Sequence, residues 1–169
     1  MKRITVAIFV MLFSALQMNA QKIGYIDTEK ILKAIPAYTS AQNQLESLSE
    51  KYRKEIEAEY AVIETMYNNY QSQKQYLSAQ ARQQKENEII NREQAVKQLQ
   101  NRYFGQDGNM QKKSGELLDP IKAKVDEAVK KVAAEGGYML LLDVAVLQGV
   151  AYRDEAYDLS AKVIANLGN

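Results

Sequence analysis

Two residue types with rich chemistry, cysteine and histidine, are absent from this sequence of 169 residues. Without cysteine the chain forms no disulfide bond and carries out no thiol chemistry. Without histidine it lacks the most common metal ligand and the most common general base at neutral pH. We therefore expect a fold held by packing alone, with no metal and no cofactor.

Catalytic motifs are also missing. The sequence has no glycine-rich dinucleotide or phosphate loop, no GxSxG and no HExxH. Asp27 and Asp143 each end an apolar strand-like run, so their carboxylates could come close together. Such a pair can perform acid–base chemistry, but capping the ends of strands is the role we favour. We do not expect an enzyme.

Excess charge of one sign is absent as well. Without Lys2 and Arg3 the chain has 20 basic and 21 acidic residues. A nucleic-acid partner would need a strong basic excess, so we expect none. Locally, residues 66–106 carry six basic and three acidic side chains. This segment is either an ordinary solvated helix face or a basic zone that attracts anionic partners and makes transient contact with a membrane surface.

The first 20 residues have the pattern of a secretory signal peptide. Met1-Lys2-Arg3 is a basic start, Ile4 to Phe13 is an apolar run of about 10 residues, and Ala20 offers a small residue for cleavage. This apolar run is too short for a membrane span. We expect cleavage near Ala20 and an exported protein.

Two short strand-like runs lie more than 100 residues apart, at 22–27 and 138–143. Between them, residues 45–132 show helical spacing and a mostly polar surface. Two short strands do not form a stable body alone, and so long a helical segment cannot bury itself. The chain is therefore expected to associate with copies of itself.

The helical segment is predicted to fold back on itself at Ser78. A short helix from Thr28 stops near Pro36, and a long helix follows from about Tyr38. Its apolar positions recur every 3.6 residues on average, which predicts a nearly straight helix with a thin contact seam. Residues 73–77 supply the loop, and Ser78 can cap the return helix.

The return helix contains three residues that favour a joint. Gly105 and Gly108 are expected inside it as a flexible hinge, and Pro120 is expected to interrupt it. Gly136-Gly137 then ends the helix. Beyond it we predict a strand over 138–147 that is buried on both faces, a third strand over 150–152, and a closing helix over 157–167.

Tyrosines gather along the predicted arm. A tyrosine presents a large apolar face with a polar tip, which suits weak binding to varied apolar partners. Tyr60 and Tyr67 lie on the seam, where packing between the two helices is the interpretation we favour, while Met66 and Tyr70 stay open between core and surface. The candidate client-binding residues are Met66, Tyr67, Tyr70, Tyr76, Leu77, Tyr103 and Phe104.

Several short motifs, taken in order, resemble one family. They are Lys-Ile-Gly-Tyr-Ile-Asp at 22–27, Phe-Gly-Gln-Asp at 104–107 and Tyr-x-Leu-Leu-Leu-Asp at 138–143, placed around a long helical hairpin behind a signal peptide. This order and spacing resemble the Skp (OmpH) periplasmic chaperones over essentially the whole mature chain.

The resemblance implies a mainly helical α+β fold that assembles as a homotrimer. Residues 21–37 and 133–169 would form a β-rich association body, and residues 38–132 a helical hairpin arm with its turn near 73–79. Unfolded outer-membrane proteins would be held between the arms without ATP. The implied trimer interface comprises Ile23, Tyr25, Ile26, Met139, Leu140, Leu141, Leu142 and Val150.

A second function remains open, although the thin seam, interrupted at Gly105 and Gly108, favours a chaperone arm over a structural rod. The chain could instead serve as a spacer or tether in the cell envelope. A rod favours a tight, repeated seam, whereas a flexible joint at Gly105 and Gly108 favours the chaperone.

Overall fold

The structure is a computed structural model that describes residues 22–168. The signal-peptide prediction, including Ala20, falls outside the described residues. Two compact units divide the chain. Of the described residues, 22–32 and 125–168 form the first unit, called the body here, and 33–124 form the second, called the arm.

The body contains a parallel pair of strands, β1 (Lys22–Ile26) and β2 (Tyr138–Asp143), with Ile23 opposite Leu140 and Tyr25 opposite Leu142. Parallel strands cannot be joined by a tight turn, because the chain must first return to the end of the sheet at which the first strand began. Here the returning connection is the entire helical hairpin. The two strands predicted from the sequence are thus neighbours despite their separation.

Helices complete the core of the body. The short α2 (Thr28–Lys33) contributes Ile31, and the C-terminal α6 (Ser160–Leu167) contributes Val163, which is fully buried together with Leu159 just before the helix. The last turns of α5 (Asn109–Gly136) bury Val125, Ala128 and Val132. Gly137 follows with a φ of 64°, the left-handed geometry that glycine accepts at the end of a helix.

Two predictions for the C-terminal part are wrong, and a third, the closing helix, is confirmed with a later start. The strand β2 ends at Asp143 rather than 147, and it is not buried on both faces, because Met139, Leu140 and Leu142 are exposed. No strand forms over 150–152; residues 144–154 form a loop without regular structure. The closing helix starts at Ser160, after a short 3₁₀ turn, η2 (Glu155–Tyr157).

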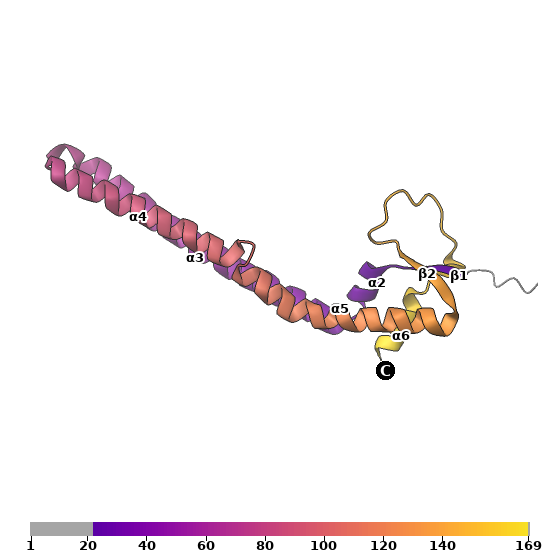
Figure 1. Cartoon of the computed structure of the whole chain (residues 1–169). Helices are drawn as coiled ribbons and strands as arrows, with labels where there is room; N and C mark the ends of the chain where they lie inside the picture. The colour runs from indigo at the N-terminus through magenta and orange to yellow at the C-terminus, as the bar shows by residue number, and fades with distance from the viewer. Residues whose placement is uncertain (1–21, 169) are drawn as a thin grey trace, which may run out of the picture. The chain divides into compact units, whose positions relative to one another are not determined.

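The arm is built on a long antiparallel hairpin of α3 (Pro36–Gln73) and α4 (Ala79–Phe104) (Figure 1). Between them the chain turns through η1 (Lys74–Tyr76). Ser78 is the N-cap of α4, with its hydroxyl accepting from the amide of Ala81 at 3.2 Å. This cap is the one predicted from the sequence. Pro36 opens α3, where its missing amide hydrogen costs nothing.

The return path consists of two helices rather than one. Residues 105–108 separate α4 from α5, so Gly105 and Gly108 lie in a break and not inside a helix, contrary to the prediction. A Cβ at Gly105 would overlap the carbonyl oxygen of Asn101, so this turn needs glycine. By contrast, α5 continues through Pro120, and the predicted interruption there is wrong. Glu116, whose carbonyl loses its partner, is exposed to water.

Candidate functional site

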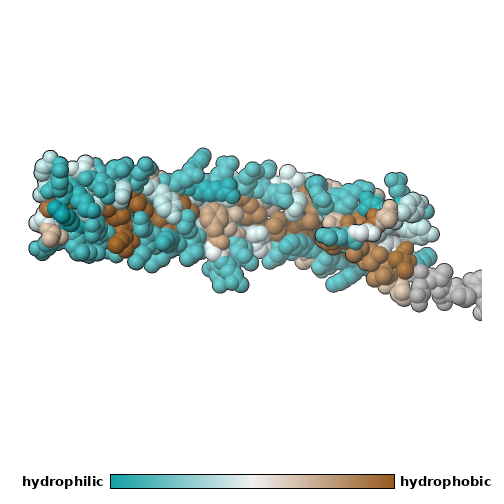
Figure 2. Space-filling view, turned by 90° about the horizontal axis from the view of Figure 1, so that it is seen from above, coloured by the Kyte–Doolittle hydropathy of each residue, from teal (hydrophilic) through white to brown (hydrophobic). Residues whose placement is uncertain are grey.

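The seam between α3 and α4 repeats every seven residues. Ile56, Ile63 and Tyr70 are buried from α3, and Ile89 and Val96 from α4. This spacing is that of a coiled coil rather than the 3.6-residue stripe predicted above. The earlier stripe included Tyr60 and Tyr67, which lie beside the seam. In Figure 2 the apolar residues form a narrow line between polar edges.

Polar side chains reach across the seam at both ends of this apolar core. Toward the tip, the hydroxyl of Tyr70 donates to Glu86; toward the break, that of Tyr103 donates to Glu55 at 2.5 Å. Each hydrogen bond, together with burial and the nearby carboxylate charge, raises the pKa of its tyrosine above 10.0. Between them Arg92 pairs with Glu59. These pairs set the register of the two helices.

An aromatic cluster lies where α4 meets the break. The rings of Tyr52 and Tyr103 stack at 3.8 Å between centroids, and Phe104 meets Tyr52 edge-on at 6.2 Å. Tyr52 was not among the candidate site residues. Tyr52 lies seven residues before Glu59 and fourteen before Met66, so a heptad repeat places all three on the same face of α3. This repeat is the sequence signal that could have indicated Tyr52 as a site residue.

The predicted client-binding residues divide into two groups. Tyr70 is only 5% exposed and belongs to the hairpin core, so this structure does not offer it as a surface contact; Met66, Leu77 and Tyr103 pack partly against the same core. The exposed group consists of Tyr67, Tyr76 and Phe104. Tyr76 is 82% exposed at the tip.

Tyr60 and Tyr67 do not pack between the helices, contrary to the prediction. Both are exposed. Tyr60 lines a pocket of about 440 Å³ between α3 and α4, together with Phe104, Arg53, Glu57, Ile56, Gln100, Asn101 and Gly105. The tyrosine that the prediction placed in the core therefore stands at the surface instead.

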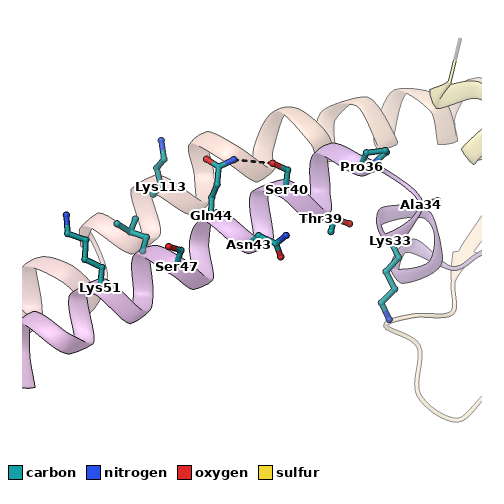
Figure 3. Close-up of a pocket in the computed structure, with 11 residues that line it drawn as sticks. Lys33, Ala34, Pro36, Thr39, Ser40, Asn43, Gln44, Ser47, Lys51 and Lys113 are labelled. Carbon is teal, nitrogen blue, oxygen red and sulfur yellow. Dashed lines mark hydrogen bonds between the residues drawn. The ribbon is translucent and has the colours of Figure 1, made fainter.

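A larger groove, of about 980 Å³, lies between the start of α3 and the arm portion of α5 (Figure 3). Its lining is mainly short polar side chains, such as Ser40 and Gln44, which are hydrogen-bonded to each other at 3.3 Å. Two of its lysines have carboxylate partners, Lys51 with Glu55 and Lys113 with Glu116.

The predicted interface residues of the body also divide. Tyr25 and Ile26 are buried within the single chain, where the guanidinium of Arg153 lies over the Tyr25 ring, so they serve the core of the body rather than an exposed surface. Leu141 is half-buried. The remaining five are exposed: Ile23, Met139, Leu140, Leu142 and Val150.

The two strand-end aspartates act as caps. Asp143 accepts from the hydroxyl of Thr28 at 2.7 Å and from the amides of Thr28 and Ala145, and Asp27 accepts from the amide of Lys30. These contacts match the capping role that we favoured. They tie the start of α2 to the end of β2.

Comparison with known proteins now identifies the chain. The model of the family described as Outer membrane protein (OmpH-like) matches residues 22–167. The chain belongs to the OmpH-like family. This match spans both strands of the body and the whole hairpin.

Two curated relatives of this OmpH-like chain carry the name Chaperone protein Skp. The one from Yersinia enterocolitica is 24% identical over 153 residues, which cover 90% of each chain. The one from Vibrio cholerae serotype O1 is 26% identical over 163 residues, covering 92% of this chain and 90% of its own. A solved structure described as an OmpH-like outer membrane chaperone, from Caulobacter crescentus, has a TM-score of 0.67 at 12% identity, with 86% and 82% of the two chains covered. That likeness confirms the mainly helical α+β fold.

Within residues 22–168 of this OmpH-like chain, no group of acidic side chains is arranged to hold a metal ion. In the same range no helix is both long and apolar enough to cross a membrane.

Proposed function

We propose that this OmpH-like protein is an ATP-independent holdase that binds unfolded outer-membrane β-barrel proteins in the periplasm. The proposed assembly is a homotrimer in which residues 21–37 and 133–169 associate with their copies and residues 38–132 hold the client. The family and the chaperone name of its relatives support a chaperone of this type.

One observation carries the proposal most directly. The hairpin already completes a core of its own, yet it leaves large apolar side chains in water: Tyr60, Val62, Tyr67, Tyr76, Ile90 and Phe104. None of these residues belongs to the buried core of the seam. Scattered over a polar surface, they offer many weak contacts to an apolar segment, and the sum of such contacts holds a client that can still leave.

Assembly through the body is supported by its open strand. Within the described chain β2 pairs only with β1, so the backbone N–H and C=O groups along its other edge have no strand partner. Met139 of β2 is 60% exposed. An open apolar edge is a template for pairing with another chain. Copies of the same chain would cover it, and three arms would then surround one client.

The test is dilution of a urea-unfolded outer-membrane barrel protein into buffer with the mature chain in excess. The expected result is a soluble barrel protein and, by native mass spectrometry, a trimer that holds one client. Light scattering equal to that of the barrel protein alone would disprove the holdase function. A monomer in the mass spectrum would disprove the assembly.

The envelope spacer remains a second candidate, because the heptad seam from Tyr52 to Tyr103 is the tight repeat that a rod favours. The break at 105–108 separates the two functions. In amide hydrogen exchange, fast exchange over 100–110 supports a hinge at Gly105 and Gly108, whereas protection as strong as that of the hairpin core supports the rod.

A further inference from the structure

The exposed apolar residues of the hairpin are not spread evenly around it. Tyr60 and Tyr67 are seven residues apart on α3, and Ile90 and Phe104 are fourteen apart on α4, so each pair occupies one stripe of its helix. Tyr60 and Phe104 line the same pocket. All four therefore lie on one flank of the hairpin, which we call the aromatic flank.

The opposite flank is different. Val62 lies two residues after Tyr60 and hence about 160° around the helix from it. It is 44% exposed, almost the same as Tyr60 at 43% and Phe104 at 43%. Val62 is thus a matched reference, since it has the same exposure and the same level along the arm but faces the other way.

The pocket on the aromatic flank is lined by residues of distinct chemistry. Its lining includes the aromatic residues Tyr60 and Phe104 and the amide residues Gln100 and Asn101. Phe104 packs edge-on against Tyr52, which in turn stacks on Tyr103. The Phe104 ring is therefore held in place before any ligand arrives, which reduces the entropy lost on binding.

Its charges identify the kind of occupant. Arg53 and Glu57 contribute one positive and one negative group, so the lining has no net charge and favours a neutral side chain. Aromatic rings pack against other rings in stacked or edge-on geometry, and carboxamides can both donate to and accept from a peptide backbone. A volume of about 440 Å³ accommodates one large side chain with its adjoining backbone.

We infer that this pocket binds an aromatic side chain of an extended, unfolded polypeptide, with Gln100 and Asn101 bonding the backbone beside it. The inference rests on the proposed holdase function and adds to it a pocket that selects aromatic side chains of the client. Outer-membrane barrels carry girdles of aromatic residues at both membrane interfaces, so each unfolded client offers many such side chains.

The absence of tryptophan from this chain makes a direct test possible, because the fluorescence of a tryptophan-containing probe reports on the probe alone. The probe is a capped 12-residue peptide of glycine, serine and threonine with one central tryptophan. Its emission should shift to the blue on binding. Tyr60→Ser and Phe104→Ser should each weaken binding at least fivefold, and Val62→Ser should change it less than twofold.

Two further variants separate loss of the pocket from loss of the fold. Tyr60→Phe keeps the ring and should bind as the original chain does; Phe104→Leu keeps an apolar side chain and should lose most of the preference for tryptophan. Thermal unfolding followed by circular dichroism checks each variant. Equal losses for Val62→Ser and Tyr60→Ser, or equal competition from the peptide with leucine in place of tryptophan, would overturn the inference.

Failure here is distinct from failure of the proposed function. A chain that keeps the barrel protein soluble while Tyr60→Ser changes nothing is a holdase without this pocket. A chain that binds the tryptophan peptide through Tyr60 but lets the barrel protein aggregate has the pocket without the holdase function.

Discussion

In the arm, α3 and α4 bury Ile63 and Val96 against each other and so complete a seam within one chain. The body does the opposite with much of its apolar surface, since Met139, Leu140 and Leu142 of β2 stay exposed. Both regions belong to the same chain in the same structure.

The difference follows from geometry. A helix satisfies its own backbone and needs only a narrow stripe of contact, which one antiparallel partner supplies. A strand satisfies its backbone only through neighbouring strands, and a sheet of two strands leaves an edge without a strand partner. The arm thus completes its seam within one chain, whereas the body leaves apolar strand residues exposed, which the proposed assembly would cover. The predictions below test this contrast.

The largest effect is expected for Leu140→Asp in β2. A carboxylate on this exposed apolar strand would have to be buried on association, and burying an unpaired charge costs several kcal/mol, about enough to abolish assembly. Native mass spectrometry should show a monomer with helical content unchanged in circular dichroism. Tyr76→Asp, at the exposed tip of the arm, is the control and should remain a trimer.

Next comes Ile63→Ala in the seam of the arm. Removing this buried side chain should lower the free energy of unfolding by about 2–4 kcal/mol, as for other large-to-small changes in a core. Urea denaturation measures the loss. Because the arm and the body bury their apolar groups separately, the oligomeric state should not change; dissociation of the assembly would show that the two regions depend on each other.

Ser78→Ala is expected to have a smaller effect on the arm. It removes the hydroxyl that accepts from the Ala81 amide and should cost about 1 kcal/mol of hairpin stability. Amide exchange should quicken in the first turn of α4 before anywhere else. A change confined to the body would contradict the local role assigned to this cap.

High pH should weaken the arm through Tyr70 and Tyr103, and the body core through Tyr25, whose pKa is raised by burial. Because the hydrogen bonds to Glu86 and Glu55 raise the pKa of Tyr70 and Tyr103, the stabilisation is complete below pH 10.0 and is lost as the pH rises through the higher folded-state values. Thermal unfolding followed between pH 8 and 11 should show the fall. In Tyr70→Phe with Tyr103→Phe it should be smaller; an identical fall would assign it to other groups.

Low pH should act on the body, with the smallest effect. Burial raises the pKa of Asp158, but hydrogen bonds from Ser160 and the nearby Lys30 ammonium outweigh burial and hold it below 3.8. The stabilisation is therefore complete above pH 3.8 and is lost as the pH falls through the lower folded-state value. Asp158→Asn should flatten this acid dependence in thermal unfolding.

Local features were predictable from the sequence where one residue type has one physical reason to be present. Ser78 caps a helix because its hydroxyl accepts amide hydrogen bonds, and Gly137 ends one because it tolerates a positive φ. The two strands were visible as apolar runs. The third strand, over 150–152, was not realised, because an apolar triplet becomes a strand only when another strand lies beside it.

Faces of the helices were harder to predict than their existence. Tyr60 and Tyr67 fit a 3.6-residue stripe, yet the seam follows a seven-residue repeat and leaves both outside. Two periods so close together differ by only about 20° over one heptad, and the choice depends on the partner helix. The pocket around Phe104 was invisible for the same reason, since its residues come from two helices whose register is set by contacts such as Tyr103 with Glu55.

By itself, the sequence determined which reactive groups the chain contains and which secondary-structure elements it forms. It has no thiol or imidazole, and it forms two apolar strands, long polar helices and a turn capped by Ser78. Each of these depends on a residue and its near neighbours along the chain. Tertiary structure alone decided which tyrosines are core and which are surface, and that β1 and β2 lie side by side with one edge open. Such features depend on residues far apart in sequence, whose packing selects one register from several that local preference leaves nearly equal.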